Sequence, residues 1–364
     1  MKQLLYIIVA LLFTGCTAVK HTAGKNLTAT INSLRLLGEY EIPWQKQFAG
    51  TTIGGLSGID YDAGKNVYYL ISDDRSAINP ARFYTAAIAF SEKGIDSIQF
   101  LSVTTLKQPN GQPYPALGKG LGATPDPEAI RYNSVLQQWF WSSEGECIIK
   151  AGDTTLIDPA IYITNQQGVC IDSLIIPTYL HMQATEKGPR QNGVLEGLAF
   201  SDDFKTLYAS IEEPLYEDGP RATAEKGGLT RIAAFDLRTH KSVAQYFYPL
   251  DPIAHAPTEP GKYAANGISE ILAVNAHQLL VIERSFTIGA GFTIKLFLAD
   301  LEKTDKPVSK KLLLDMTGLN RYIDNVEGVS FGPTLPNGHR TLILVTDNNF
   351  NKEEKTQFFV FEVL

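Results

Sequence analysis

Alternation of apolar and polar residues runs through most of the chain and predicts β-strands almost throughout. Two such strands joined by a turn recur five times, and the second strands read VYYLISDD, QWFWSSE, TLYASIEE, QLLVIE and TLILVTD. Their enrichment in β-branched and aromatic residues is typical of strands. No stretch shows a convincing amphipathic helical period. We therefore predict an all-β fold.

Each hairpin opens with a similar short motif. The motifs read SGIDY, EAIRY, EGLAF, EILAV and EGVSF, and they begin at Ser57, Glu128, Glu196, Glu270 and Glu327. Two further strands can be placed in each interval between motifs. A long repeat made of four strands is typical of a β-propeller blade. The pattern predicts five blades, with six as the alternative if the segments 106–127 or 178–193 contain additional strands.

The last repeat lacks one strand. Only QFFVFEVL follows its hairpin, whereas the segment RLLGEYEIP at 35–43 precedes the first motif and has no blade of its own. We expect this N-terminal strand to pair in the last blade and close the ring. Closure of this kind removes the exposed strand edges that would otherwise invite aggregation.

The N-terminus predicts export. MKQLLYIIVALLFTGC combines one lysine, an apolar run too short for a permanent membrane span, and small residues before Cys16. The TGC sequence resembles a bacterial lipobox, which predicts lipidation of Cys16; a plain signal peptide cut nearby is the alternative. We assign 1–16 to the signal peptide and lipobox, 17–33 to a polar tether and 34–364 to the propeller. A lipid-anchored protein of the outer membrane, facing the periplasm, is expected.

The charge of the chain limits its partners. The formal net charge is −7 and no basic block stands out, which argues against duplex nucleic acid. Membrane contact is expected through the lipid anchor only. Beyond Cys16, the chain has only Cys147 and Cys170, and the sequence leaves open whether they form a disulfide.

Carboxylates mark both ends of the hairpins. In a propeller the first strand of each blade lines the channel, and its start lies at the same face as the end of the second strand. The motif acids are Glu128, Glu196, Glu270 and Glu327, and the closing acids are Asp73, Asp74, Glu144, Glu212, Glu213, Glu283 and Asp347. Any single one could be a turn cap, but their recurrence predicts a shared cation site at one channel mouth. Oxygen ligands favour Ca²⁺, and the histidines lie outside the motifs, which argues against zinc.

Two arginines accompany these acids. Arg75 follows Asp74, and Arg284 follows Glu283. Guanidinium groups bind phosphate oxygens in a bidentate manner. A mouth that holds both clustered carboxylates and arginines fits a small anionic substrate, although pairing of each arginine with a neighbouring acid is the alternative.

These motifs resemble the bacterial phytase-like family, known as "esterase-like activity of phytase" proteins. The resemblance is carried by the repeated Glu-Gly motif, by the DDR segment at 73–75, and by NVEGVSF and VTDNNF near the C-terminus, and it covers roughly 35–364. It implies a phosphoester hydrolase. The implied site contains Glu128, Glu196, Glu270, Glu327, Asp73, Asp74, Arg75 and Asp347. Ser57 departs from the pattern.

Two functional hypotheses follow. In the first, Ca²⁺ is held by Glu128, Glu196, Glu270, Glu327, Asp73 and Asp347. Arg75 and Arg284 then stabilise the transition state of phosphoester hydrolysis, and Glu212 or Asp74 is the general base. In the second, the protein is a non-catalytic periplasmic or surface binding propeller with a structural metal. A lactonase-type hydrolase is a weaker alternative.

Overall fold

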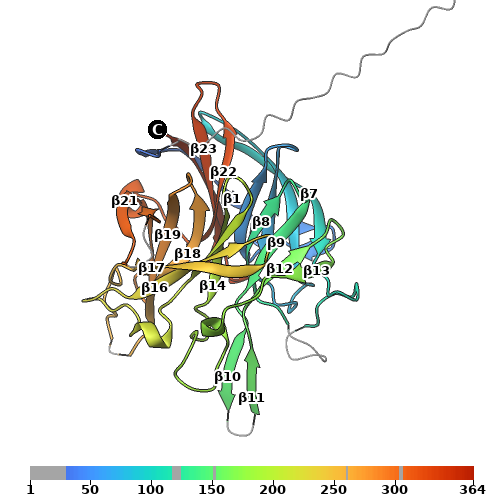
Figure 1. Ribbon diagram of the computed structural model, residues 1–364. Helices are drawn as coiled ribbons and strands as arrows, with labels where there is room; N and C mark the ends of the chain where they lie inside the picture. Colours follow the sequence, from blue (N-terminus) through green and yellow to red (C-terminus); the bar gives the residue numbers. More distant parts are fainter. Residues whose placement is uncertain (1–29, 117–123, 151–152, 260, 303–305) are drawn as a thin grey trace, which may run out of the picture.

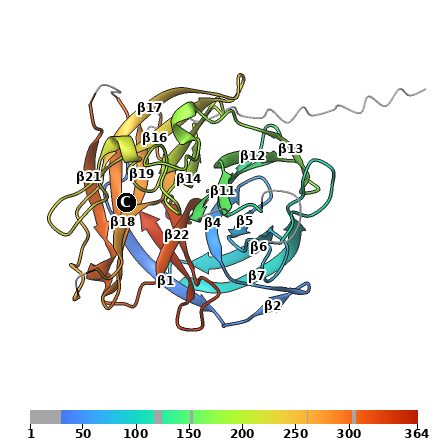
Figure 2. The ribbon, with the colours of Figure 1, turned by 90° about the horizontal axis from the view of Figure 1, so that it is seen from below.

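The computed structural model describes residues 30–116, 124–150, 153–259, 261–302 and 306–364. Five four-stranded antiparallel sheets form a ring, as Figure 1 shows from the side and Figure 2 from below. The predicted five-bladed propeller is confirmed. Cys16 and the expected signal segment lie outside the described residues.

The five blades follow one another along the chain. Blade 1 contains β4 (Leu56–Asp62), β5 (Val67–Ser72), β6 (Arg82–Ser91) and β7 (Gly94–Thr105). Blade 2 contains β8 (Pro127–Asn133), β9 (Gln138–Ser143), β12 (Ala160–Thr164) and β13 (Cys170–Ser173). Blade 3 contains β14 (Leu195–Phe200), β15 (Thr206–Ile211), β16 (Leu229–Asp236) and β17 (Lys241–Pro249). Blade 4 contains β18 (Ala264–Ala273), β19 (Gln278–Thr287), β20 (Gly291–Asp300) and β21 (Ser309–Asp315).

The N-terminal strand closes the ring as predicted. Blade 5 contains β22 (Asn325–Thr334), β23 (Arg340–Asp347), β24 (Thr356–Val363) and β1 (Leu34–Ile42). Strand β1 is antiparallel to β24, from Leu34 opposite Val363 to Ile42 opposite Thr356. The last blade therefore gains its outer strand from the start of the domain, and the two ends of the propeller are joined by backbone hydrogen bonds.

Apolar side chains fill the spaces between neighbouring blades. Between blades 2 and 3, for example, Phe140 and Ile163 belong to the same buried cluster as Leu198 and Leu207. Each sheet is therefore covered on both faces, which explains why its strands carry apolar residues so densely. Both described cysteines, Cys147 and Cys170, are free thiols.

An additional hairpin interrupts blade 2 and was not predicted. Strands β10 (Glu146–Lys150) and β11 (Asp153–Ile157) lie between β9 and β12 and form their own two-stranded sheet. Figure 1 shows this hairpin projecting from the lower end of the ring. Because β10 follows directly on the end of β9, the hairpin stands beside the channel mouth at which the second strands end.

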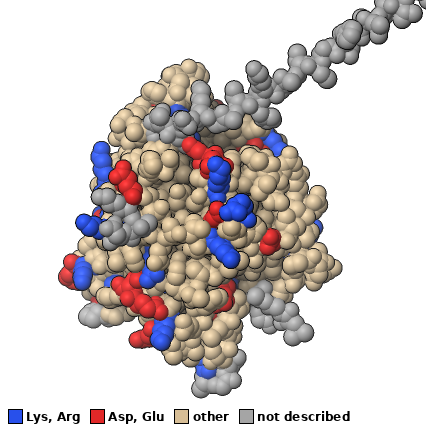
Figure 3. All heavy atoms as spheres, in the orientation of Figure 1, with Lys and Arg blue, Asp and Glu red and all other residues tan. Residues whose placement is uncertain are grey.

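The remaining elements are short. They are the ribbon β2 (Gln47–Phe48) and β3 (Thr51–Thr52) and the 3-10 turns η1 (Thr178–Leu180), η2 (Tyr216–Asp218) and η3 (Met316–Leu319). Among the described residues, none of the helices has the length and apolarity needed to cross a bilayer. The face drawn in Figure 3 carries acidic and basic side chains interspersed among neutral residues.

Candidate functional site

Every channel-lining strand carries a register shift near its start. The last regular pairs before the shift are Leu56 with Ser72, Pro127 with Ser143, Leu195 with Ile211, Ile268 with Glu283 and Val326 with Thr346. One extra residue then enters the first strand, as in a β-bulge, and a bulge redirects the side chain at that point. The residues that follow these pairs on the first strands are Ser57, Glu128, Glu196, Ser269 and Glu327.

This register corrects the sequence alignment of blade 4. Ser269, not Glu270, occupies the position of Glu128 and Glu196. Its hydroxyl donates to the Val326 carbonyl at 2.8 Å, just as the Ser57 hydroxyl donates to the Glu128 carbonyl at 2.8 Å. The motif ring thus has glutamates in blades 2, 3 and 5 and serines in blades 1 and 4.

The same shift applies to the closing positions. On the second strands, the residues that follow the partners named above are Asp73, Glu144, Glu212, Arg284 and Asp347. Blade 4 therefore supplies a guanidinium where the other four blades supply a carboxylate. The sequence predicted Arg284 at the mouth, but it did not predict that Arg284 takes the place of an acid.

Glu270 and Glu283 consequently point elsewhere. Glu270 lies inside the ring, where its Oε2 is 2.8 Å from Nη2 of Arg131. Glu283 accepts hydrogen bonds from Tyr248 and Asn266, each at 2.9 Å, and forms an ion pair with Lys310. A one-residue slip turns a strand side chain to the opposite side. For this reason Glu270 lies apart from the other predicted ligands, and Glu283 lies apart from the other closing acids.

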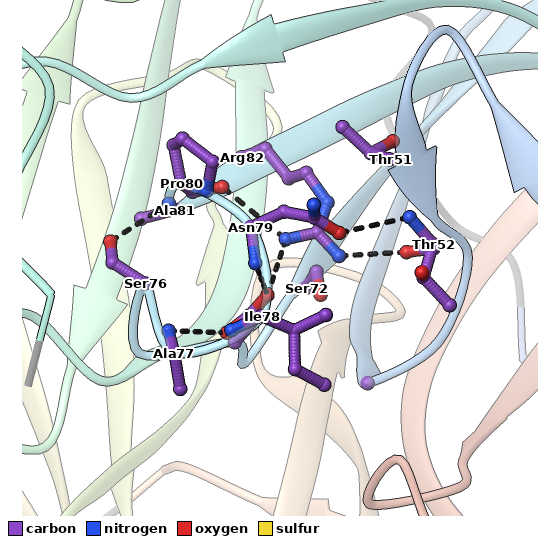
Figure 4. A network of polar contacts seen from close by, with 12 residues as sticks. Thr51, Thr52, Ser72, Ser76, Ala77, Ile78, Asn79, Pro80, Ala81 and Arg82 are labelled. Carbon is purple, nitrogen blue, oxygen red and sulfur yellow. Dashed lines mark hydrogen bonds and ion pairs between the residues drawn. The ribbon is translucent and has the colours of Figure 1, made fainter.

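Asp74 is also placed away from the mouth. Its Oδ2 is 2.8 Å from Nη1 of Arg82, and its two oxygens accept backbone hydrogen bonds from residues 77, 78 and 79. Figure 4 shows this network, in which Arg82 also donates to the Thr52 carbonyl. Asp74 thus organises the loop after β5, which gives no support to its predicted role as a general base. Glu213 likewise pairs with Arg221, at 2.7 Å.

The other predicted acids converge on one cavity of about 560 Å³. It lies at the mouth where the first strands begin and the second strands end. Nine carboxylate side chains line it: Asp73, Asp126, Glu128, Glu144, Glu196, Glu212, Glu327, Asp347 and Glu354. Two guanidinium groups, of Arg75 and Arg284, accompany them. Acids from blades 1, 2, 3 and 5 therefore share one space, whereas Glu270 and Glu283 of blade 4, which the sequence analysis also placed at the mouth, do not line it.

Two groups of three carboxylates have the spacing of cation ligands. The first is Asp126, Glu128 and Glu144, and the second is Glu144, Glu196 and Glu212; in each, one oxygen per residue lies within 4.8 Å of the others. All five side chains are buried, and Glu144 belongs to both groups. Oxygen donors that converge in this way suit Ca²⁺, which accepts many oxygen ligands in flexible geometry.

A buried amide oxygen adds to this donor set. Asn325 is 2% exposed and lines the cavity, and its Nδ2 donates to Glu327 Oε1 at 2.8 Å. Its Oδ1 has no hydrogen-bond partner within the described part of the chain. A buried polar atom without a partner is costly. A cation or a bound ligand in the cavity would satisfy it.

Burial raises the pKa of the cavity carboxyls, although two arginines lie beside them. The pKa rises to about 6 for Asp126, to about 7 for Glu144 and to about 8 for Glu212, chiefly because desolvation disfavours the charged form. Burial also raises the pKa of Glu128 and Glu196 well above the usual range. The cavity therefore holds protons that a cation would displace.

The two arginines neutralise only part of this charge. Arg284 Nη2 is 2.6 Å from Glu212 Oε1 and 3.7 Å from Glu327 Oε1, and Arg75 pairs with Asp126 at 3.4 Å and Glu146 at 3.2 Å. The Nε atoms of both arginines are buried and lack a hydrogen-bond partner among the residues described, but Arg75 Nε is the atom that lies 3.4 Å from Asp126 Oδ2. Arg284 Nε is therefore the buried donor of this pair that is left without an acceptor in the described structure.

Two important residues of the cavity escaped the sequence analysis. Asp126 and Asn325 each stand two positions before a motif glutamate, in DPE and NVE. Side chains two residues apart in a strand share a face, so this spacing was the available signal. In each strand a β-bulge follows at once and interrupts the two-residue alternation, so this spacing was not recognised in the sequence.

Comparison with known proteins agrees with this fold. Residues 51–350 match the family described as "Phytase-like: Esterase-like activity of phytase". Among proteins with curated descriptions, none matches the chain.

The chain also shows remote likeness to several solved structures. An α-L-arabinofuranosidase from Lactobacillus brevis is 10% identical, with 85% of this chain and 91% of that chain covered and a TM-score of 0.47. The periplasmic gluconolactonase PpgL of Pseudomonas aeruginosa is 11% identical, with 85% of each chain covered and a TM-score of 0.36. The gluconolactonase XC5397 of Xanthomonas campestris is 10% identical, with 92% and 99% covered and a TM-score of 0.36. By the family match over most of its length, the chain belongs to the phytase-like family.

Proposed function

We propose that the protein is a metal-dependent phosphoester hydrolase that works in the acidic cavity. The observation that carries the proposal is the pair of carboxylate triads joined at Glu144, inside a cavity that also contains the guanidinium groups of Arg75 and Arg284. The description of the family as esterase-like supports hydrolysis of an ester bond. Ca²⁺ is the favoured ion because the donors are carboxylate and amide oxygens, and no described histidine lines the cavity.

The five triad residues would hold the metal, with Asn325 Oδ1 as an additional donor. A bound divalent cation would supply charge neutralisation at phosphate oxygens and a water of lowered pKa. Glu212 belongs to a triad and is paired with Arg284, so its geometry favours a ligand role over the predicted role as base.

The protein's own groups would do the rest. Arg75 and Arg284 line the cavity and would bind and orient the phosphoryl oxygens through their guanidinium groups and stabilise the charge that develops there. Four carboxylates of the cavity lie outside the triads, namely Asp73, Glu327, Asp347 and Glu354. Of these, Asp73 and Asp347, which the sequence analysis assigned to the metal, would accept a proton from the attacking water. Burial raises the pKa of both groups well above the usual range, chiefly through desolvation of the charged form.

The test is hydrolysis of p-nitrophenyl phosphate and bis(p-nitrophenyl) phosphate with Ca²⁺ or with EDTA. We expect turnover that requires Ca²⁺ and is lost in Glu196→Gln. A matched control is Glu302→Gln, an exposed glutamate after β20, which ends at the opposite face of the ring. Ca²⁺ that raises the melting temperature without any turnover across these esters would instead support the alternative, a binding propeller with a structural ion.

We also propose, from the N-terminal sequence, that the protein is exported, lipid-anchored and faces the periplasm. The motif that supports it is TGC at 14–16. Incorporation of labelled palmitate into the full chain, absent in Cys16→Ser, is the expected result. Unlabelled wild-type protein in the soluble periplasmic fraction would contradict the anchor and leave the proposed activity unaffected.

A further inference from the structure

A second cavity, of about 290 Å³, adjoins the acidic one and has a different character. The two cavities share Phe286, Phe292 and Glu354 as lining residues. Ile294, Met316 and Ile323 form the apolar part of the second cavity. We call it the aromatic pocket. A dry apolar cavity of about 150 Å³ accommodates benzene, so the aromatic pocket has room for a substituted or fused ring.

A row of aromatic rings leads from one cavity to the other. Tyr263 and Phe286 have ring centroids 6.2 Å apart, and Phe286 and Phe292 have centroids 4.7 Å apart. Tyr263 lines the acidic cavity alone, whereas both phenylalanines line the two cavities. Neighbouring rings in this row are tilted by 39° and 44°, and each offers a π-face on which a planar group can stack.

The charged groups at the rim of the aromatic pocket are already engaged. Arg321 is 3.1 Å from Glu39, and Glu354 accepts hydrogen bonds from Asn349 at 2.8 Å and Asn351 at 2.9 Å. The interior therefore offers apolar surface, and a substituent that needs charged partners would gain little there. This arrangement matches a ligand with one ionic end and one apolar end.

We infer that the substrate is a phosphoester of an apolar, ring-containing alcohol, whose ring occupies the aromatic pocket while its phosphoryl group occupies the acidic cavity. This inference rests on the proposed function, because it assigns the phosphoryl group to the carboxylate and arginine site. It excludes polyols carrying many phosphates as the preferred substrate class, since these have no apolar face to place against Phe286 and Phe292.

Binding measurements separate the two claims. Isothermal titration calorimetry with Ca²⁺ and with EDTA would use three ligands that are not hydrolysed: methylphosphonate, 1-naphthol and 1-naphthylphosphonate. We expect 1-naphthylphosphonate to bind at least about tenfold more tightly than methylphosphonate. Ala290→Trp should abolish this gain, because Ala290 is exposed and lines only the aromatic pocket. Thr317→Trp, in the same pocket, serves if Ala290→Trp does not fold.

The matched control is Val135→Trp, a 73% exposed residue in the turn between β8 and β9 at the opposite face, which should keep the full gain. If methylphosphonate binds but the naphthyl group adds nothing, or its gain survives both pocket variants, the inference is overturned and the proposed function stands. A third outcome is that 1-naphthol binds, that its binding is lost in the pocket variants, and that Ca²⁺ increases the affinity of neither phosphonate. This outcome supports the apolar site and overturns the phosphoester function. Absence of binding by all three ligands overturns both.

Discussion

Arg131 and Glu270 form a buried ion pair in the middle of the ring, with Nη2 of the arginine 2.8 Å from Oε2 of the glutamate. The guanidinium group also donates to one backbone carbonyl in each of the five channel-lining strands. These acceptors are Ile59 at 2.6 Å, Ile130 at 3.0 Å, Leu198 at 2.6 Å, Ile271 at 2.9 Å and Val329 at 3.3 Å. A single side chain therefore ties all five blades together.

Replacement of Arg131 should destabilise the whole propeller. Arg131→Met leaves Glu270 buried without its partner, and loss of one member of a buried pair costs about 3–5 kcal/mol. Arg131→Lys should not rescue stability, because an ammonium group has three donors where the guanidinium has five. Chemical denaturation would measure both variants. A stability of Arg131→Lys close to that of the wild type would show that the five-carbonyl arrangement is unimportant.

Loss of Asp74 should affect stability but not cation binding. Asp74→Asn removes the buried charge that pairs with Arg82, and we expect a cost of about 3–5 kcal/mol. The Kd for Ca²⁺ should stay unchanged, because Asp74 does not line the acidic cavity. Denaturation and calorimetry on the same variant give the two readouts. A weakened affinity for Ca²⁺ with intact stability would restore Asp74 to the site predicted from the sequence.

The three central glutamates should differ in how they affect cation binding. Glu144→Gln removes a ligand from both triads, whereas Glu128→Gln and Glu196→Gln each remove one from a single triad. We therefore expect Glu144→Gln to weaken Ca²⁺ binding at both triads by at least about tenfold. Glu128→Gln and Glu196→Gln should each weaken Ca²⁺ binding at one triad only. Titration calorimetry with Ca²⁺ would resolve this, with Glu302→Gln as the unaffected control. Equal, small effects of all three substitutions would argue against shared triads.

Without divalent cations, stability should fall as the pH rises. Burial raises the pKa of Asp126 to about 6, of Glu144 to about 7 and of Glu212 to about 8, whereas carboxyls in an unfolded chain titrate at about 4. Between these values the folded state binds more protons than the unfolded state, so the free energy of unfolding decreases with pH.

This stabilisation is complete below about pH 4, decreases as the pH rises above that value, and is lost once the pH has passed the folded-state pKa values of about 6 to about 8. We expect the melting temperature in EDTA to decrease from about pH 5.5 to about pH 8.5. The increase caused by Ca²⁺ should be larger at the higher pH, because the ion competes with protons for the same oxygens. A melting temperature in EDTA that rises across this range would contradict the assignment.

Repeat counting was sufficient to predict the blades and the closure of the ring. The five hairpins reappear as β4–β5, β8–β9, β14–β15, β18–β19 and β22–β23, and the segment at 35–43 pairs with the last strand. Alternation of apolar residues has a period that any strand displays, so these features did not depend on tertiary detail.

The roles of the residues at the channel mouth, in contrast, depended on tertiary detail. In blade 4 the sequence offers Ser269 and Glu270 side by side, and Glu283 and Arg284 likewise, and pattern matching favoured the two acids. The ladder pairs Ile268 with Glu283, which turns Ser269 and Arg284 toward the mouth instead. The choice between neighbouring residues is fixed by the bulge, which the local sequence does not specify.

The most direct test of the central claim, that carboxylates from separate blades hold a common cation, is anomalous diffraction from crystals grown with Tb³⁺ in place of Ca²⁺. The structure predicts a peak in the acidic cavity bounded by Glu128, Glu144 and Glu196, with Asn325 Oδ1 turned toward it. Ordered Tb³⁺ peaks elsewhere on the protein, with none in this cavity, would contradict the account.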